Sequence, residues 1–455
     1  MIYITMKQSP SYHQMTLEEF LFQPDYVPPV ISQDTTSTRT YEAWYVSSRI
    51  ANKLGFNIGG LIGILNSFNE QHKSLFEMDR HELYNNFYQE KKGKGMGMVF
   101  KNVFKTQKKY VQCDTGAVCS GIAKILTPLL HKHPAKQHKE IFDDCESSLK
   151  DFLGQHGFDT SVIDLQEIIS PAYRRIDAPV DELQAALYQL KTIFDNDFRA
   201  LYHTSAYAYI HGRSTLDAVK KHQANESKWF YKGDLKNFFN NTTLEFIMRM
   251  FSMIYPFSEV VRYGGKKALE TAIGLAMLDG GLPQGTKISP TITNIMMIPI
   301  DYTLTKTLRK MKFVNIRYAD DFIISSKYHF DYKDVEKVIT DTLASFNAPF
   351  TLNESKSRYG SSAGSNWNLG VMLNKDNEIT VGYKDKRKFQ AMLASYVMDK
   401  QNGRPWDIED VRVLEGYRTY YKMVEGETID RIVDHVGNKF GVSIPHLIKQ
   451  DLRVT

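Results

Sequence analysis

Two apolar, β-branched runs flank a pair of acids in the tetrapeptide Tyr318-Ala319-Asp320-Asp321. Strand-forming runs on both sides of a short polar turn predict a β-hairpin that carries two carboxylates at its tip. Adjacent carboxylates repel each other, so the pair adds nothing to the stability of the turn. Asp is common in turns, and a solvated turn is therefore one interpretation. The other is a divalent cation, because Mg²⁺ takes carboxylate oxygens and shares them with substrate phosphates.

A second strand pattern, residues 229–234, ends at Asp234. The spacing of Thr242 and Glu245 is that of a capping box and predicts a helix from Leu244 to Ile254. On its own, Asp234 is equally an ordinary helix-capping acid. Together with the hairpin it supplies the carboxylates that two-metal phosphoryl transfer requires.

A turn-forming segment, Gly281-Leu282-Pro283-Gln284-Gly285, lies between these acids. Ser289-Pro290 and a helical run over residues 291–300 follow it. Glycine lets the backbone approach a ligand closely, although a generic Gly/Pro turn is the alternative.

The chain has 455 residues, a length that predicts two or three domains. Its net charge is +5. No apolar run is long enough for a transmembrane helix, and the first residues lack the pattern of a signal peptide. Three cysteines (Cys113, Cys119 and Cys145) are too few and too scattered for a disulfide framework or a zinc site. We therefore expect free thiols, no membrane association and a cytoplasmic protein.

A lysine-rich segment without acids interrupts the helical N-terminal pattern. Such a segment is either a solvated surface or a flexible loop that follows a phosphate backbone, and we expect RNA binding. Its lysines are Lys91, Lys92, Lys94, Lys101, Lys105, Lys108 and Lys109.

Three segments resemble motifs A, B and C of reverse transcriptases: Asp234-x-x-x-Phe238-Phe239, residues 281–290 and residues 318–321. The resemblance covers roughly residues 165–440. It implies an α+β right-hand polymerase fold of fingers, palm and thumb, with a mostly helical N-terminal extension. The expected divisions are 1–160 for this extension, 161–233 for the fingers, 234–375 for the palm with finger elements, and 376–455 for the thumb and C-terminal helices.

The resemblance implies an RNA-directed DNA polymerase with two Mg²⁺ ions as cofactors. The metal ligands would be the side chains of Asp234, Asp320 and Asp321 and the backbone carbonyl of Leu235. Lys356, in a segment like motif D, is the expected general acid that protonates the departing pyrophosphate; a solvated charge is the alternative.

Contacts to nucleotide and nucleic acid are also implied by the resemblance. Arg174 would hold the triphosphate of the incoming dNTP, and Gln284 with Gly285 would position the template–nucleotide pair. Phe239, five residues after Asp234, would leave no room for the 2′-OH that distinguishes ribonucleotides. The expected primer and template contacts are Arg213, Tyr318, Trp367 and Gly370.

The segment Arg174-x-Ile176-x-Ala178-Pro179 is most similar to bacterial retron and defence-associated enzymes. Two departures favour the defence-associated ("unknown group", abortive-infection-like) enzymes. Retron enzymes carry Val-Thr-Gly where this chain has residues 368–370, and about 160 residues precede the expected fingers. The thumb takes up most of the chain after Asp321, so no ribonuclease H domain is expected. Enzymes of this kind act against phage and use a structured non-coding RNA.

Two other classes stay open on the sequence. One is a catalytically inactive RNA-binding scaffold, against which the intact acids argue. The other is a polymerase that needs no template or that primes on its own side chain. The template RNA, the DNA product, the priming group and homo-oligomerisation are left open as well.

Overall fold

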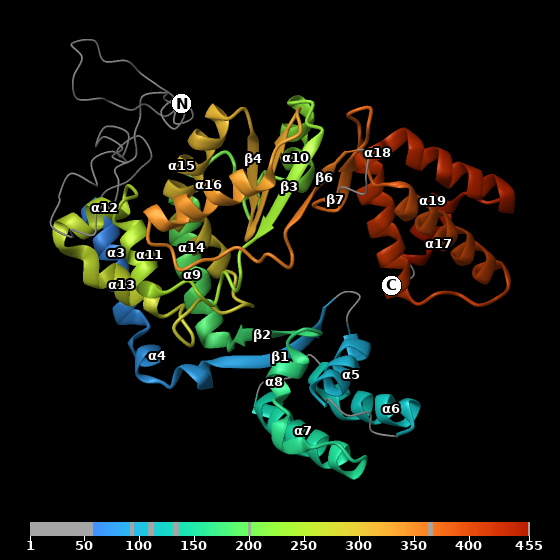
Figure 1. Cartoon of the computed structure of the whole chain (residues 1–455), viewed down its shortest axis with the longest axis horizontal. Coiled ribbons are helices and arrows are strands. Elements are labelled where there is room, and N and C mark those ends of the chain that lie inside the picture. The colour runs from blue at the N-terminus through green and yellow to red at the C-terminus, as the bar shows by residue number, and fades with distance from the viewer. Residues whose placement is uncertain are drawn as a thin grey trace. The chain divides into compact units, whose positions relative to one another are not determined.

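The computed structural model describes residues 58–91, 95–107, 113–130, 136–198, 202–362 and 367–453. Their elements group into two compact units, each assembled from segments that are far apart in sequence (Figure 1). The first unit takes the chain up to Tyr202, Asn237–Pro299 and Ala348–Phe350. The second takes His203–Lys236, Ile300–Asn347 and Thr351–Thr455. The four divisions expected from the sequence do not coincide with these units, and they stay a prediction.

The first unit is mostly helical. Its helices are α3 (Ile58–Gln71), α4 (Lys73–Glu77), α5 (Gly95–Thr106), α6 (Thr115–Leu126), α7 (Lys136–Gln155), α8 (Leu165–Ile169), α9 (Asp181–Phe198), α11 (Leu244–Phe251), α12 (Phe257–Val260), α13 (Lys266–Gly274) and α14 (Ser289–Met296). Its strands are β1 (Tyr84–Glu90) and β2 (Tyr173–Pro179), and a 3₁₀ turn, Arg80–Leu83, precedes β1.

Strands β1 and β2 pair antiparallel along their whole length, from Tyr84 opposite Pro179 to Glu90 opposite Tyr173. Figure 1 shows the two strands side by side although one is blue and the other green. Helices α5–α8 lie between them in sequence and share a buried apolar core that includes Val99, Ile122 and Leu149. The expected boundary at residue 160 therefore falls between two strands that pair.

Helix α11 begins at Leu244, as the sequence predicts, but the predicted capping box is wrong. The N-cap is Thr243, whose hydroxyl oxygen accepts a hydrogen bond from the Phe246 backbone N–H at 3.2 Å. The hydroxyl of Thr242 is buried and donates to the Phe238 carbonyl oxygen at 2.8 Å. The predicted cap residue is thus engaged with the preceding turn, and its neighbour takes the capping position.

The second unit combines sheets and long helices. Its helices are α10 (Thr215–Ala224), most of α15 (Ile298–Lys310), α16 (Tyr332–Ser345), α17 (Tyr383–Gln401), α18 (Ile408–Phe440) and α19 (Ile444–Asp451). Its strands are β3 (Trp229–Asp234), β4 (Val314–Tyr318), β5 (Asp321–Ser326), β6 (Arg358–Ser361), β7 (Trp367–Asn368), β8 (Val371–Leu373) and β9 (Ile379–Thr380). The α+β class predicted from the sequence is confirmed.

A four-stranded antiparallel sheet of order β4-β5-β3-β6 forms the centre of the second unit. Side chains alternate between the two faces of a strand, so Phe230, Lys232 and Asp234 share one face of β3 and Tyr231 lies on the other. The Tyr231 hydroxyl donates to Glu336 on α16 at 3.0 Å. The acid at the end of β3 therefore lies on the face opposite α16.

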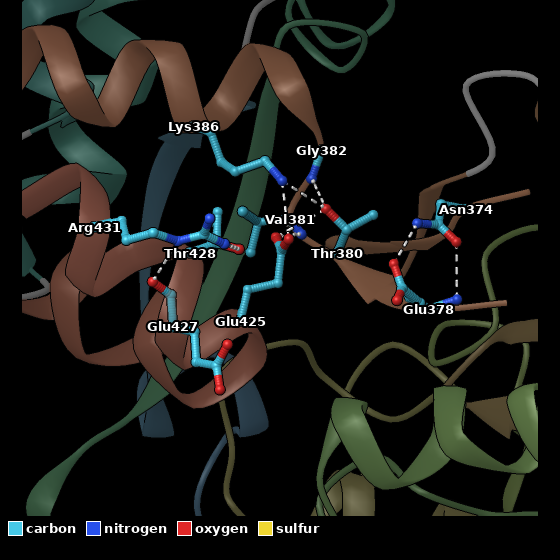
Figure 2. Close-up of polar contacts among 10 residues, drawn as sticks. All are labelled: Asn374, Glu378, Thr380, Val381, Gly382, Lys386, Glu425, Glu427, Thr428 and Arg431. Atoms are coloured by element: carbon cyan, nitrogen blue, oxygen red, sulfur yellow. Dashed lines mark hydrogen bonds and ion pairs between the residues drawn. The ribbon is translucent and has the colours of Figure 1, made fainter. Parts of the chain in front are cut away.

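Helix α18 is interrupted at Glu425, whose backbone angles (φ −138°, ψ 61°) are not helical. Its carboxylate accepts hydrogen bonds from the Thr380 hydroxyl and the Val381 N–H, each at 2.8 Å, and from Lys386 Nζ at 2.9 Å (Figure 2). These contacts connect the break in α18 to the segment between β9 and α17. Lys386 belongs to the basic start of α17.

The three cysteines are free thiols, as expected. In the described part of the chain, no helix combines the length and the apolar character needed to span a bilayer.

Candidate active site

Asp234 and Asp321 lie directly opposite each other in the register of β3 and β5. Asp320 belongs to the two-residue turn between β4 and β5, beside Ala319, whose φ is 58°. The backbone N–H of Leu235 donates to the Asp320 carbonyl oxygen at 3.1 Å. The predicted hairpin is thus present, and its two carboxylates lie with that of Asp234 at one end of the sheet.

A buried ion pair supports the hairpin turn. Two nitrogens of the Arg317 guanidinium donate to the two carboxylate oxygens of Asp301, each at 2.7 Å, and a third donates to the Ala319 carbonyl oxygen at 3.0 Å. Both side chains are almost fully buried, and such charges are stable only when they are paired and hydrogen-bonded. This pair was not predicted from the sequence. Its signal was an arginine inside an apolar strand.

Two lysines contact the carboxylates. Lys356 Nζ lies 2.9 Å from Asp234 Oδ2, and Lys232 Nζ lies 2.8 Å from Asp321 Oδ2. Asn353 Nδ2 also donates to Asp234 Oδ2 at 3.3 Å. Lys356 was predicted to act here, whereas Lys232 was not. Its signal was its position two residues before Asp234, which puts both side chains on one face of a strand.

The carboxylates influence one another's ionisation. The pKa of Asp320 is raised to about 6, first by burial and then by the negative charges of Asp321 and Asp234. Burial also raises the pKa of Asp321, while its hydrogen bond to Lys232 opposes that rise. Like charges in a partly buried site disfavour ionisation, so further positive charge would stabilise the ionised carboxylates.

The donors of this cluster suit a hard divalent cation, because carboxylate oxygens are the ligands that Mg²⁺ prefers. They do not form a finished cage. Within the described ranges, no three His, Cys, Asp or Glu side chains are arranged to hold a metal ion. Two of the carboxylates contact lysines in the structure. Proteins usually bind Mg²⁺ through one or two carboxylates plus water and substrate phosphates, and the residues present fit that pattern.

The residues predicted to meet the nucleotide lie in the first unit, on three segments that contact one another. Arg174 is exposed on β2. The Gln284 carbonyl accepts from the backbone N–H of Asp177, also on β2, at 2.7 Å. The Phe239 carbonyl accepts from the Leu282 N–H at 2.9 Å. The loop of residues 281–285 is therefore bonded both to the strand of Arg174 and to the turn of Phe239.

Two glycines allow this loop to approach its neighbours. A Cβ at Gly281 would lie 2.1 Å from the Asn240 carbonyl oxygen, and one at Gly285 would lie 2.6 Å from the Asp177 carbonyl oxygen. Gly285 also has a φ of 135°, which L residues rarely adopt. Any side chain at either position would push the loop off its neighbouring segment.

The residues predicted to contact primer or template lie in the second unit. Arg213 Nη1 donates to two backbone carbonyls, among them that of His203 at 2.5 Å, so it supports its own loop. Tyr318 is half-buried at the end of β4, and Gly370 is exposed with a φ of 88°. The side chain of Trp367 lies outside the described residues.

Three of the seven predicted RNA-binding lysines are described. Lys101 and Lys105 are exposed, one helical turn apart on α5. Lys91 Nζ donates to the carbonyl of Ser170. The other four, Lys92, Lys94, Lys108 and Lys109, lie outside the described residues.

Residues 172–389 match the family model described as reverse transcriptase (RNA-dependent DNA polymerase). The chain is similar to two Escherichia coli proteins, the retron Ec83 and retron Ec73 reverse transcriptases. It is 27% identical to the first over 289 residues, which are 61% of this chain and 86% of that protein. It is 28% identical to the second over 234 residues, which are 49% of this chain and 71% of that protein.

The chain is also similar to two solved structures of telomerase. One is telomerase from Candida albicans in complex with a fragment of telomeric RNA, and the other is apo telomerase from Candida tropicalis. The TM-scores are 0.39 and 0.37, at 11% and 12% identity. Both matches cover 62% of this chain, and 63% and 60% of the telomerase chains, which is less than two thirds of their length.

Proposed function

We propose that this chain is a retron-like RNA-directed DNA polymerase with a specific role. Its residues 172–389 match the reverse transcriptase family. It would copy a structured non-coding RNA into DNA from dNTPs, in the bacterial cytoplasm, as part of defence against phage. The observation that carries the catalytic part is the convergence of Asp234, Asp320 and Asp321 at one sheet end.

Asp234, Asp320 and Asp321, with the carbonyl of Leu235, would hold two Mg²⁺ ions. When bound, these ions would supply charge to the attacking 3′-oxygen and to the leaving pyrophosphate. The contacts of Lys356 and Lys232 with Asp234 and Asp321 support this assignment, because they mark where positive charge is favourable.

The lysine at position 356 would have a second role in the reaction. Its side chain is 59% exposed, so the ammonium group can leave Asp234 without breaking packing. Once released, it would donate a proton to the departing pyrophosphate oxygen.

Selection of the nucleotide would rest on the three segments joined in the first unit. Arg174 would bind the triphosphate, Gln284 and Gly285 would face the template–nucleotide pair, and Phe239 would exclude the 2′-OH. The hydrogen bonds between the loop of residues 281–285 and its two neighbours support this grouping.

The partner RNA is proposed from charge and resemblance. Lys101 and Lys105 present positive charge on one face of α5, which suits the phosphate backbone of a folded RNA. The motif similarity to defence-associated enzymes supports the role against phage. Of the two bacterial subgroups left open by the sequence, the similarity to the retron Ec83 and Ec73 reverse transcriptases favours retron enzymes.

The experiment is sequencing of nucleic acid that co-purifies with the full chain expressed from its native locus. The double variant Asp320→Ala/Asp321→Ala serves as the control. We expect one discrete RNA in both samples and complementary DNA in the wild type alone. Homopolymeric or protein-linked DNA would favour the untemplated or self-primed alternative.

The single variant Asp320→Ala tests the metal assignment. It should lower DNA synthesis by at least about 100-fold, because a charged ligand at the transition state is lost. Asp341→Ala is the control, since Asp341 is 63% exposed and pairs with Lys337 on the surface of α16. Near-normal synthesis by Asp320→Ala would sink the two-metal proposal.

A further inference from the structure

Three charged side chains and a histidine form an ionic brace beside the loop of residues 281–285. The ionic brace consists of His81, Arg175, Asp177 and Asp279, which come from the 3₁₀ turn before β1, from β2, and from the turn that precedes the loop. None of these residues was singled out by the sequence analysis. All four lie in the first unit.

Arg175 stands at the centre of the ionic brace. Its Nε lies 2.7 Å from Asp177 Oδ1, and its Nη2 lies 3.9 Å from Asp279 Oδ2. The other oxygen of Asp279 is 3.2 Å from His81 Nε2. Arg175 and Asp177 are two residues apart on β2 and therefore share one face of the strand. Exposed Arg174 lies on the opposite face, so the two neighbouring arginines have different surroundings.

The ionic brace acts on the loop through Asp177. The side chain of Asp177 is only 11% exposed, and burial raises its pKa while Arg175 opposes that rise. The backbone of Asp177 donates to the Gln284 carbonyl, and its own carbonyl is packed against Gly285. A shift of Asp177 would therefore shift Gln284 and Gly285 with it.

The ionic brace also holds the start of the loop. Asp279 has a φ of 51°, an unusual backbone conformation, and lies in the turn closed by the bridge between Leu278 and Gly281. Non-glycine residues keep such a conformation only when surrounding contacts favour it. The ion pair of Asp279 with Arg175 and its contact with His81 supply such contacts.

The far side of the loop contacts the turn that contains Phe239. Leu282 N–H donates to the Phe239 carbonyl, and Gln284 Nε2 lies 3.5 Å from Asn240 Oδ1. The loop thus has β2 on one side and the Phe239 turn on the other. The position of the loop between β2 and this turn therefore sets the distance from Phe239 to Gln284.

We propose that Arg175 is a positioning residue that sets the discrimination between deoxyribonucleotides and ribonucleotides. It does so by holding the loop of residues 281–285 at the spacing from Phe239 that leaves no space for a 2′-OH. The inference rests on the proposed function, in which Phe239 excludes the 2′-OH and Gln284 meets the nucleotide pair. Small displacements of positioning groups have large effects on rate, which makes such a role measurable.

The test is primer extension by the full chain on poly(rC)·oligo(dG), with dGTP and GTP as the competing substrates. These substrates differ only by the 2′-OH. For Arg175→Ala we expect the ratio of kcat/KM for dGTP to that for GTP to fall about threefold to tenfold. Arg175→Lys keeps the charge but cannot span both acids, and its ratio should be intermediate.

A second variant reaches the ionic brace without altering β2. Asp279→Asn removes the negative charge and keeps a residue type that tolerates positive φ. It should lower the same ratio, and the double variant Arg175→Ala/Asp279→Asn should be close to Arg175→Ala, because the contact between the two residues is already lost in Arg175→Ala.

The controls separate positioning from stability. Lys150→Ala removes an ion pair of the same unit, Lys150 with Glu146, in which the lysine is 37% exposed against 36% for Arg175. This variant should keep the wild-type ratio. An Arg175→Ala variant with a lower Tm but an unchanged ratio would overturn the inference and leave the ionic brace a purely structural feature.

Phe239→Ala distinguishes failure of the inference from failure of the proposed function. If Phe239→Ala lowers the ratio and Arg175→Ala does not, the role of Arg175 is wrong and the gate stands. If Phe239→Ala also leaves the ratio unchanged, the gate itself is wrong and the inference falls with it.

Discussion

At the residue scale, the acid cluster is a balance of like charges and two lysine counter-charges. Asp234 and Asp321 each have a lysine within 3 Å, since the two distances are 2.9 and 2.8 Å. Asp320 has its pKa raised to about 6 by burial and by its two acidic neighbours. Each charge in such a cluster affects the affinity for cations, so the direction in which that affinity changes when one charge is removed can be predicted.

Removing Lys232 should make Mg²⁺ bind more tightly. Lys232→Met takes away a positive charge that competes for Asp321, and the Kd for Mg²⁺ should fall by about threefold to tenfold. Isothermal titration calorimetry on the full chain without nucleic acid measures this directly. Lys327→Met is the control, because Lys327 pairs at the surface with Glu226. Unchanged or weaker binding by Lys232→Met would contradict the competition.

The raised pKa of Asp320 predicts a pH dependence of stability. In the folded protein the carboxyl binds its proton up to about pH 6, whereas in the unfolded chain its pKa is near the ordinary value of 3.8. The stabilisation is complete below the ordinary value and is lost as the pH rises through about 6. In EDTA, the free energy of unfolding of the wild type should therefore fall between these values relative to Asp320→Asn. Parallel curves for the two proteins would rule out this contribution.

At the element scale, local sequence signals place most helices and strands, whereas bonds from elsewhere decide where elements end or bend. Strand β3 occupies residues 229–234, as its aromatic run followed by an acid predicts. Helix α11 takes its cap from Thr243 because Thr242 is bonded to the turn before it. Helix α18 is interrupted at Glu425 where that carboxylate binds three donors outside the helix.

The break in α18 should depend on the side chain of Glu425. Glu425→Ala leaves the Thr380 hydroxyl and the Val381 N–H without their acceptor and Lys386 without its ion pair, which costs about 1–3 kcal/mol. Unfolding by urea measures the loss. Glu427→Ala is a matched control two residues along, since Glu427 is exposed (Figure 2). Equal effects of the two substitutions would show that the contacts of Glu425 add no stability.

At the scale of the whole molecule, the chain crosses repeatedly between two compact units. The carboxylates and lysines of the acid cluster belong to the second unit, and the segments of Arg174, Phe239 and Gln284 belong to the first. Helices α5–α8 form a module with its own apolar core between the paired strands β1 and β2. Lys101 and Lys105 are on this module, so RNA binding there can be tested apart from the acids.

The double variant Lys101→Ala/Lys105→Ala should weaken binding of a folded RNA hairpin to the full chain. Two lost phosphate contacts should reduce the slope of log K against log salt concentration by about 1 to 2. Fluorescence anisotropy at several salt concentrations measures both quantities. Lys124→Ala, on the exposed side of α6, is the control. An unchanged slope in the double variant would show that these lysines do not contact RNA.

The sequence by itself determined the local elements and indicated the family. Apolar and aromatic runs, the acids at strand and hairpin ends, and the Gly/Pro segment indicated β3, the β4–β5 hairpin and the loop of residues 281–285. These features depend on neighbours in the chain, so they can be predicted without knowing the tertiary structure. They were also enough to predict the reverse transcriptase family, which the comparisons support.

Only the tertiary structure decided which distant residues meet. The pairing of β1 with β2 across α5–α8, the contact of Lys232 with Asp321, and the ionic brace around Arg175 all join segments that carry no mark of each other in sequence. Strand register and burial set these contacts, because a one-residue slip would move every side chain of a strand to the other face. The sequence shows which residues are charged, and only the tertiary structure shows which residues they contact.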